Sequence, residues 1–285
     1  MRAFPTTALL AASLLLLTAC KTIPVATPQA DAAPADDNLN AVLWVQTSVE
    51  YAALAEQTYR AAADRLEAAL KEPDWDALPP DERGNAITGL PPAVILDIDE
   101  TVLDNSPYQA RLVRDGASYN DTTWNAWVNE RKARPVPGVL DFAHAASAHG
   151  VTLLYISNRA TSLREATLAN LKSAGLPVAD DGVFLGLGQA VPDCDPQGKE
   201  SEKHCRRLLA GRKYRVLMQF GDQLGDFVQV RDRSRAGHAA LHAEYADWFG
   251  ERWFMLPNPT YGGWETRYKD PQRREAKRAA LDVAP

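Results

Sequence analysis

Hydrophobic positions along the chain follow two different patterns. From Leu39 to Lys71 apolar residues recur every three or four positions, which predicts one amphipathic helix. Four later runs are short, apolar and rich in β-branched and aromatic residues, which is typical of strands covered on both faces of a parallel sheet. These runs are residues 93–96, 151–156, 182–185 and 214–220.

Helical patterns lie between the predicted strands. One runs from residue 139 to His149 and another from Ser162 to Ala174, and a glycine follows each. Strands that alternate with helices predict an α/β fold with a doubly wound parallel sheet. The basic run from Arg267 to Arg278 is interpreted as the solvated face of a C-terminal helix. We expect a core over about residues 90–260, with helical additions from 39–72, 104–137 and the C-terminus, and a small, mainly helical cap within 104–137.

The N-terminus indicates export. Arg2 precedes a 12-residue apolar stretch, Ala8 to Ala19, which is typical of a signal peptide and too short to span a bilayer. Leu17-Thr18-Ala19-Cys20 resembles the lipobox of bacterial lipoproteins, in which the signal is cut before the cysteine and the cysteine is lipidated. We expect a signal peptide over 1–19, then over 20–38 a lipidated Cys20 and a flexible linker rich in Ala, Pro and Asp.

Three further features bear on location and partners. Lys21 follows the cysteine, which resembles lipoproteins sent to the outer membrane of Gram-negative cells. The 31 Lys+Arg against 37 Asp+Glu give a net charge of −6, so the chain lacks the positive surface of a general nucleic-acid binder. Cys194 and Cys205 are eleven residues apart in a chain expected to be exported, and we expect them to form a disulfide.

Polar residues follow the ends of three predicted strands. Asp97-Ile98-Asp99-Glu100-Thr101 comes after the first, Ser157-Asn158-Arg159 after the second, and a GDxxxD sequence from Gly221 to Asp226 after the last. Ligands bind outside the carboxyl ends of the strands in an open α/β sheet, so we expect one shared site. A single Asp there is more often a turn former or a helix cap. Crowded carboxylates, however, need a divalent cation, and oxygen ligands favour Mg²⁺.

These motifs resemble the haloacid dehalogenase (HAD) superfamily of phosphohydrolases, and more closely the class C acid phosphatases, which are bacterial lipoprotein 5′-nucleotidases and phosphomonoesterases. The closer resemblance rests on ILDIDETVLDNSPY (95–108), YISNR (155–159), FGDQLGDF (220–227) and LPNPTYGGWE (256–265). It implies a HAD-like, Rossmann-type acid phosphatase domain over 39–285 and an acidic pH optimum.

The resemblance also implies roles for particular residues. Asp97 would be the nucleophile that forms an aspartyl-phosphate, and Asp99 would protonate the leaving oxygen and then activate water. Ser157 would donate a hydrogen bond to a phosphoryl oxygen, and a lysine would balance its charge. Asp97, Asp222 and the backbone carbonyl of Asp99 would hold one Mg²⁺, with Asp226 completing or orienting the metal shell.

For the lysine and the substrate contacts, the sequence leaves alternatives. Lys203 matches the family's Ser-x-Lys-x-x-Arg-Arg stretch and is preferred to Lys199, although both would share one face of a predicted helix. Trp124 and Tyr261 are candidates to stack a nucleobase or nicotinamide ring, as in the family's aromatic clamp, or are ordinary core aromatics. The remaining candidates for substrate binding are Asn158 and Arg159.

Three functions are consistent with these residues. The first is a Mg²⁺-dependent, lipid-anchored acid phosphatase that acts on small phosphomonoesters, such as nucleoside 5′-monophosphates or nicotinamide mononucleotide. The second is phosphotransfer to an alcohol by the same residues. The third is a non-catalytic binding lipoprotein, like related plant storage proteins in which the nucleophile can be lost. The retained Asp97, Asp99, Ser157, Asp222 and Asp226 favour an enzyme. The resemblance also allows a homodimer, and no nucleic-acid partner is expected.

Overall fold

The computed structural model describes residues 38–195, 201–265, 273–281 and 283. The predicted signal peptide, the lipidated Cys20 and Lys199 lie outside the described residues. No helix in the described part of the chain is long and apolar enough to cross a membrane.

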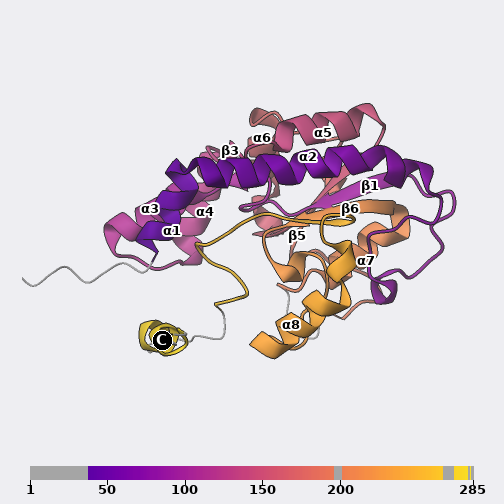
Figure 1. Cartoon of the computed structure of the whole chain (residues 1–285). Coiled ribbons are helices and arrows are strands. Elements are labelled where there is room, and N and C mark those ends of the chain that lie inside the picture. Colours follow the sequence, from indigo (N-terminus) through magenta and orange to yellow (C-terminus); the bar gives the residue numbers. More distant parts are fainter. Residues whose placement is uncertain (1–37, 196–200, 266–272, 282, 284–285) are drawn as a thin grey trace, which may run out of the picture. The chain divides into compact units, whose positions relative to one another are not determined.

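A five-stranded sheet forms the centre of the described fold, with strand order β5-β4-β1-β6-β7 (Figure 1). All its pairings are parallel, which confirms the predicted parallel sheet. Four of its strands overlap the predicted apolar runs, although β4 extends further and β5 begins two residues later than predicted. β7 was not predicted because it has only three residues. The strands are β1 (Pro92–Leu96), β4 (Thr152–Ala160), β5 (Phe184–Leu187), β6 (Arg215–Gly221) and β7 (Trp253–Met255).

Helices lie on both faces of this sheet. In Figure 1, α2 (Val49–Lys71) and α5 (Val139–Ala148) lie on one face and α7 (His204–Lys213) lies on the other. This arrangement confirms the doubly wound α/β fold. Other helices of the described residues are α6 (Arg164–Ser173), α8 (Arg235–Glu244) and α9 (Arg273–Ala279). Short 3₁₀ turns are η1 (Pro80–Glu82), η2 (Thr161–Leu163), η3 (Asp181–Val183), η4 (Leu224–Asp226) and η5 (Ala246–Trp248).

The single helix predicted over 39–71 is wrong in one respect. The chain forms α1 (Leu39–Thr47) and α2, and Ser48 between them is extended, with φ −83° and ψ 139°. The Ser48 hydroxyl accepts a hydrogen bond from the N–H of Tyr51 at 3.0 Å and so caps α2. The apolar stripe continues across the break, so periodicity alone did not reveal it.

The segment between β1 and β4 carries the helical addition expected for 104–137. It contains α3 (Ser106–Asp115) and α4 (Asp121–Glu130). A two-stranded antiparallel ladder of β2 (Leu103–Asp104) and β3 (Arg134–Pro135) closes its base.

Packed aromatic rings join the helices to the sheet. The ring centroid of Phe220 on β6 lies 4.6 Å from that of Phe142 on α5 and 5.4 Å from that of Tyr59 on α2. Each ring is buried, and burying such a side chain is worth about 1.5–3 kcal/mol. The Tyr59 hydroxyl donates to the carbonyl oxygen of Thr101 at 2.7 Å, so the core also fixes the loop after β1.

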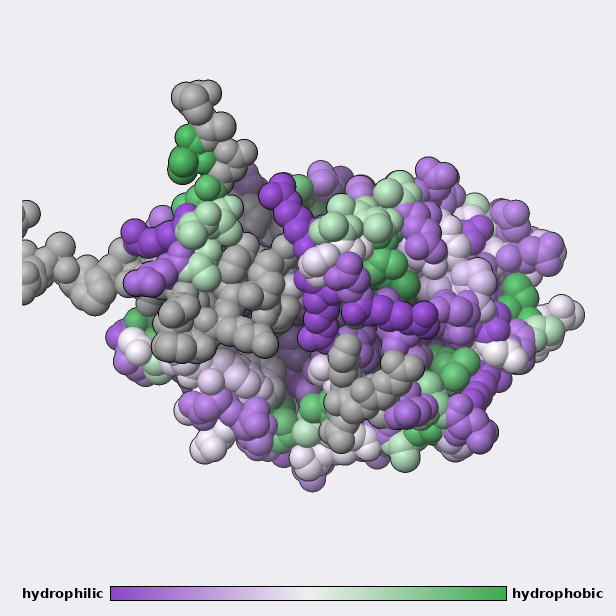
Figure 2. Space-filling view, turned by 90° about the horizontal axis from the view of Figure 1, so that it is seen from below, coloured by the Kyte–Doolittle hydropathy of each residue, from purple (hydrophilic) through white to green (hydrophobic). Residues whose placement is uncertain are grey.

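Two features concern the surface and the connections. Cys194 and Cys205 are joined by a disulfide with Cα atoms 5.7 Å apart, which confirms the predicted pairing and ties α7 to the loop before it. Figure 2 shows one face of the molecule, where the described residues are mostly hydrophilic and hydrophobic ones are scattered in small groups.

Candidate active site

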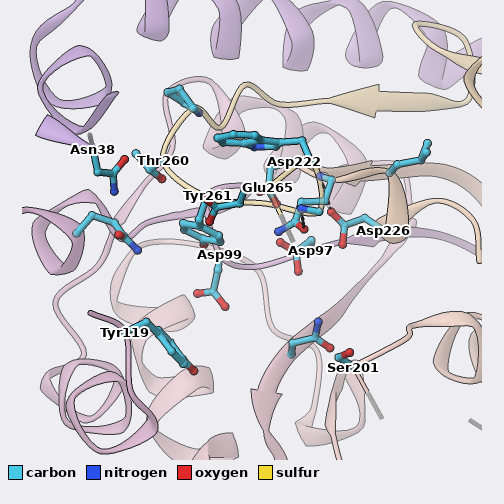
Figure 3. A pocket seen from close by; sticks show the side chains of 18 of the residues that line it. Asn38, Asp97, Asp99, Tyr119, Ser201, Asp222, Asp226, Thr260, Tyr261 and Glu265 are labelled. Carbon is cyan, nitrogen blue, oxygen red and sulfur yellow. Dashed lines mark hydrogen bonds between the residues drawn. The ribbon is translucent and has the colours of Figure 1, made fainter. Parts of the chain in front are cut away.

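The loops that follow β1 and β6 meet the last part of β4 at a cavity of about 940 Å³. Ser157, Asn158 and Arg159 were expected after the second strand, but they lie within β4, which extends to Ala160. Asp97 and Asp99 after β1, Asn158 on β4, and Asp222 and Asp226 after β6 all line it, as predicted for the carboxyl ends of the strands. Figure 3 shows the carboxylates of Asp97, Asp222 and Asp226 gathered on one side of the cavity.

Three carboxylates form a candidate metal site. Asp97, Asp222 and Asp226 each offer an oxygen atom, and these oxygens all lie within 4.8 Å of one another. The Lys203 Nζ donates to Asp97 Oδ1 and, at 2.6 Å, to Asp226 Oδ1. When ionised, the three carboxylates carry three negative charges and the Lys203 ammonium carries one positive charge. A divalent cation would balance the remaining two negative charges. The donor set is all oxygen, which suits a hard cation.

The loop after β6 is shaped to hold two of these carboxylates. Asp226 Oδ2 accepts the N–H of Gln223 at 2.9 Å, and Asp222 Oδ2 accepts the side-chain amide of Asn258 at 2.8 Å. A Cβ on Gly221 would lie 2.3 Å from the Cβ of Asp226, so the folded-back Asp226 side chain requires glycine there. This explains the residue types of the GDxxxD sequence.

Burial dominates the electrostatics of this cluster. Burial raises the pKa of Asp97 to about 7, against the effect of Lys203, and the nearby carboxylates of Asp226 and Asp99 raise it as well. Burial and then Asp226 and Asp97 raise the pKa of Asp222 well above its usual range. Burial lowers the pKa of Lys203, but Asp226 and Asp97 together keep that pKa above its ordinary value. A bound cation would favour the ionised carboxylates.

Asp99 has a different environment from Asp97. Its Oδ1 accepts from Arg159 Nε at 2.9 Å, from Arg159 Nη2 at 2.8 Å and from Asn105 Nδ2 at 2.9 Å. Its Oδ2 accepts from the Ser157 hydroxyl at 3.3 Å. The Asp99 side chain is therefore oriented by its own partners and does not belong to the three-carboxylate cluster. The expected metal contact through its backbone carbonyl stays a prediction.

The structure places some predicted residues away from the cavity wall. The Arg159 side chain is 0% exposed, and it does not line the cavity, because it is folded inward onto Asp99. Arg159 therefore supports Asp99, and the substrate contact expected of it stays a prediction. Ser157 is also buried, and its hydroxyl is directed to Asp99. Asn158 does line the cavity, and its side-chain oxygen accepts from Arg206 Nη2 at 2.7 Å.

Of the two candidate lysines, Lys203 is the one that the structure describes, and it reaches the carboxylates. Its predicted helical position is wrong, because α7 begins one residue later, at His204. Lys203 instead occupies the end of the preceding loop, where its side chain is buried against Asp97 and Asp226.

Aromatic residues form another part of the wall. Trp124 and Tyr261 both line the cavity, so the predicted clamp residues face the same space. Tyr119, which sequence reasoning missed, also lines it and is 57% exposed. Its ring centroid lies 6.2 Å from that of Trp124. Tyr119 lies between two helices, where no periodic pattern marks it.

Sequence reasoning also missed polar residues that support the site. Asn105 donates to Asp99, and its side-chain oxygen accepts from Trp127 Nε1 at 2.8 Å. Lys277, in the basic run interpreted as a solvated helix face, lies on α9, lines the cavity and binds Glu265 at 2.6 Å. Arg267 and Lys269 of that run lie outside the described residues. Motif membership was the one available signal for Asn105, which stands in ILDIDETVLDNSPY.

The parallel sheet and the cluster of acidic loops at its carboxyl end define a HAD-type phosphohydrolase architecture. The chain belongs to the acid phosphatase family of HAD superfamily subfamily IIIB, which it matches over residues 7–264. Its structure is similar to that of the class C acid phosphatase from Bacillus anthracis with tungstate bound. The two chains are 33% identical, the match covers 87% of this chain and 98% of that chain, and the TM-score is 0.73.

Plant proteins are more distant relatives. The stem 28 kDa glycoprotein of Glycine max is 28% identical over 168 residues, which cover 59% of this chain and 58% of that protein. Vegetative storage protein 1 of Arabidopsis thaliana is 25% identical over 168 residues, 59% of this chain and 54% of that protein. The matches therefore span little more than half the length of these plant relatives.

Proposed function

We propose that the chain is an acid phosphatase that hydrolyses phosphomonoesters at this cavity, with Asp97 as the nucleophile. The observation that carries the proposal is the meeting of Asp97, Asp222, Asp226 and Lys203 at the carboxyl end of the sheet. The family and the Bacillus anthracis class C enzyme support the reaction class. That enzyme was solved with tungstate, a tetrahedral oxyanion like phosphate.

The proposed cofactor is one Mg²⁺. Asp97, Asp222 and Asp226 would hold it, with the backbone carbonyl of Asp99 as a further ligand. When bound, Mg²⁺ would offset the negative charge that develops on the phosphoryl oxygens. The support for this choice is the all-oxygen donor set and the excess of two negative charges around Lys203.

In the first half-reaction, an oxygen of Asp97 attacks phosphorus, a new P–O bond forms, and the bond to the leaving oxygen breaks. Asp97 must be ionised to attack, and the Lys203 ammonium favours that form. Thr101 also donates to Asp97 Oδ2 at 3.2 Å and so restricts its orientation. The charge of Lys203 would then be shared with the transferred phosphoryl group.

Asp99 is the proposed proton carrier. Its protonated carboxyl would give a proton to the leaving oxygen, and the resulting carboxylate would take a proton from the water that hydrolyses the aspartyl-phosphate. Arg159, Asn105 and Ser157 hold its side chain while it serves both steps.

The proposed substrates carry a planar ring. Tyr119, Trp124 and Tyr261 line a cavity that is much larger than a phosphate group needs. Stacking on these rings would favour nucleoside 5′-monophosphates or nicotinamide mononucleotide. Phosphotransfer to an alcohol would use the same groups. The plant storage relative favours the alternative of a non-catalytic protein, but Asp97 and Asp99 are both present in this chain.

We also propose that the chain is a lipoprotein of the cell envelope, anchored in the outer membrane through a palmitate-bearing lipid on Cys20. The lipobox-like sequence before Cys20 and Lys21 after it support this proposal. Labelled palmitate should enter the wild-type chain, and the Cys20→Ala variant should take up none. Equal labelling of the two would contradict the proposal.

The test of the enzymatic proposal uses the full-length protein in detergent. Turnover of p-nitrophenyl phosphate, nucleotides and glycerol 2-phosphate is measured at acidic pH with Mg²⁺ and with EDTA. We expect EDTA to abolish turnover and Asp97→Asn to lower it by at least about 10³-fold. The matched control is Asp141→Asn, because Asp141 is exposed on α5 and outside the cavity. Folded wild-type protein that turns over no phosphomonoester with Mg²⁺ would overturn the proposal.

A further inference from the structure

Glu100 is a buried carboxyl group that the proposed reaction does not use. It follows Asp99 directly and is 4% exposed. Its φ of 61° lies in the left-handed region, which a residue other than glycine adopts only when its surroundings hold it there. A large acidic side chain at such a position indicates that its contacts matter.

The Glu100 side chain joins two distant parts of the chain. Its Oε1 accepts the backbone N–H of Asn105 at 2.8 Å, within the loop region that carries Asp97 and Asp99. Its Oε2 accepts the hydroxyl of Tyr261, which is 161 residues away in sequence. Glu100 therefore connects the catalytic loop to the aromatic wall of the cavity. Both bonds are buried or partly buried, so water competes for them less than at the surface.

The segment around Tyr261 has two further attachments, one on each side of the tyrosine. The side-chain amide of Asn258 donates to Asp222 at 2.8 Å, and the N–H of Gly263 donates to the side chain of Gln223 at 2.9 Å. These bonds hold the backbone of the segment against the loop after β6. The bond from Tyr261 to Glu100 is different, because it holds the ring rather than the backbone.

We propose that Glu100 is a positioning residue that fixes the ring of Tyr261 beside the catalytic loop and so favours phosphomonoesters whose leaving group carries a planar ring. This inference rests on the proposed function. Tyr261 lines the cavity while its hydroxyl is bound, so a rotation that removes the ring from the cavity breaks the hydrogen bond. A ring that is already immobilised loses less conformational entropy when a substrate stacks on it.

The experiment compares a substrate that has a ring with one that has none. Values of kcat and KM are measured for adenosine 5′-monophosphate and for glycerol 2-phosphate with the full-length protein and Mg²⁺. The variants are Tyr261→Phe, Glu100→Ala and Glu100→Gln. The matched control is Tyr155→Phe, because the Tyr155 hydroxyl donates to the carbonyl oxygen of Pro177 at 2.7 Å and Tyr155 does not line the cavity.

We expect Tyr261→Phe to raise KM for the nucleotide about tenfold, with a smaller change in kcat. The ratio of kcat/KM between nucleotide and glycerol 2-phosphate then falls by a similar factor. Glu100→Ala should lower this ratio as much, and the double variant should lower it no further. Glu100→Gln should restore it to within about twofold, because the amide oxygen can accept from Asn105 and the amide NH₂ can donate to Tyr261. Tyr155→Phe should leave the ratio unchanged.

Two results would overturn the role of Glu100. One is a Tyr261→Phe protein with an unchanged ratio, and the other is an equal loss on both substrates. Both results are measured on Tyr261→Phe, so the test remains available if Glu100→Ala does not fold. Wild-type protein that hydrolyses neither substrate would overturn the proposed function itself, which separates that failure from a failure of this inference.

Discussion

The two sides of the cavity are held by different means. Asp97, Asp222 and Asp226 come from loops at the ends of β1 and β6, where hydrogen bonds from buried or half-buried partners fix them. Tyr119 and Tyr261 come from segments outside the sheet, and Tyr119 is 57% exposed. Figure 3 shows this separation. The loops at the strand ends carry the groups proposed to react, and the added segments carry those proposed to choose the substrate, although hydrogen bonds to Glu100, Asp222 and Gln223 tie the Tyr261 segment to those loops. The two sides should therefore respond differently to substitution.

The largest effect is expected from a buried ion pair behind the carboxylate side. Arg207 donates through Nη2 to Glu82 at 2.6 Å, and through Nη1 to the carbonyl oxygens of Gly225 at 2.8 Å and Asp226 at 3.1 Å. Arg207→Met would leave the Glu82 carboxylate buried without its partner. The free energy of unfolding, measured by urea denaturation, should fall by about 3–5 kcal/mol.

The double variant Glu82→Met with Arg207→Met serves as the control. It removes both charges, so it should recover much of the lost stability. It still lacks the bonds to the loop that carries Asp226, so its affinity for the proposed Mg²⁺ should stay below that of the wild type. A loss of less than 1 kcal/mol in the single variant would mean that this pair does not support the carboxylate side.

The next effect concerns Lys203. Lys203→Met removes the ammonium group that is paired with both Asp97 and Asp226. Loss of one such stabilising donor typically costs about 10²–10³ in kcat. The fall should be the same for adenosine 5′-monophosphate and glycerol 2-phosphate, because Lys203 acts on the phosphoryl group. Lys172→Met, at an exposed position on α6, is the matched control. A loss confined to the nucleotide would contradict the division between the two sides.

The contrast between the sides also explains what the sequence could predict. The carboxylates lie in short motifs next to strongly apolar runs, so strand ends and residue types were enough to bring them together. Lys203 lies in a polar stretch, and only the resemblance to the family's Ser-x-Lys-x-x-Arg-Arg sequence pointed to it. The burial of Arg159 could not be predicted in this way, because spacing does not tell whether a side chain turns inward. The contact of Glu100 with Tyr261 joins residues 161 apart, and one sequence holds no signal for it.

The fold shows the same limit. Long or strongly apolar elements, such as β4 and β6, were predictable because burial on both faces leaves a continuous apolar run. β7 is only three residues long and was missed. The break at Ser48 was missed because the helical stripe continues through it, and one serine that caps the next helix looks the same in sequence as one exposed on a helix.

A smaller effect is expected on the aromatic side. Tyr119→Ala removes an exposed ring from the cavity wall, and it should raise KM for adenosine 5′-monophosphate about fivefold. Because the ring lies outside the core, the thermal midpoint should change by less than about 2 °C. Steady-state kinetics on the nucleotide and on glycerol 2-phosphate check this expectation. An equal change for both substrates would show that Tyr119 influences the chemistry as well as the substrate.

The smallest effect concerns the ion pair that joins α3 to α4 on the aromatic side. The hydrogen bond from Arg111, made at 2.9 Å between Nη2 and Oε2, lowers the pKa of Glu130 to about 2, and Lys132 lowers it as well. A lowered folded-state pKa gives stability that is present above the ordinary pKa near 4.5 and is lost as the pH falls toward 2. Because the Arg111 and Glu130 side chains are 42% and 28% exposed, water screens the pair, and we expect about 0.5 kcal/mol from it.

Urea denaturation of wild type and Glu130→Gln tests this value. The difference in unfolding free energy should be about 0.5 kcal/mol at pH 7, and it should shrink at pH 3 and in 1 M NaCl. The exposed pair of α3 and α4 would then contribute far less than the buried pair of Arg207 and Glu82, as the contrast between the two sides requires. A loss above 2 kcal/mol in Glu130→Gln would mean that the aromatic side is held as firmly as the carboxylate side, and the contrast would fail.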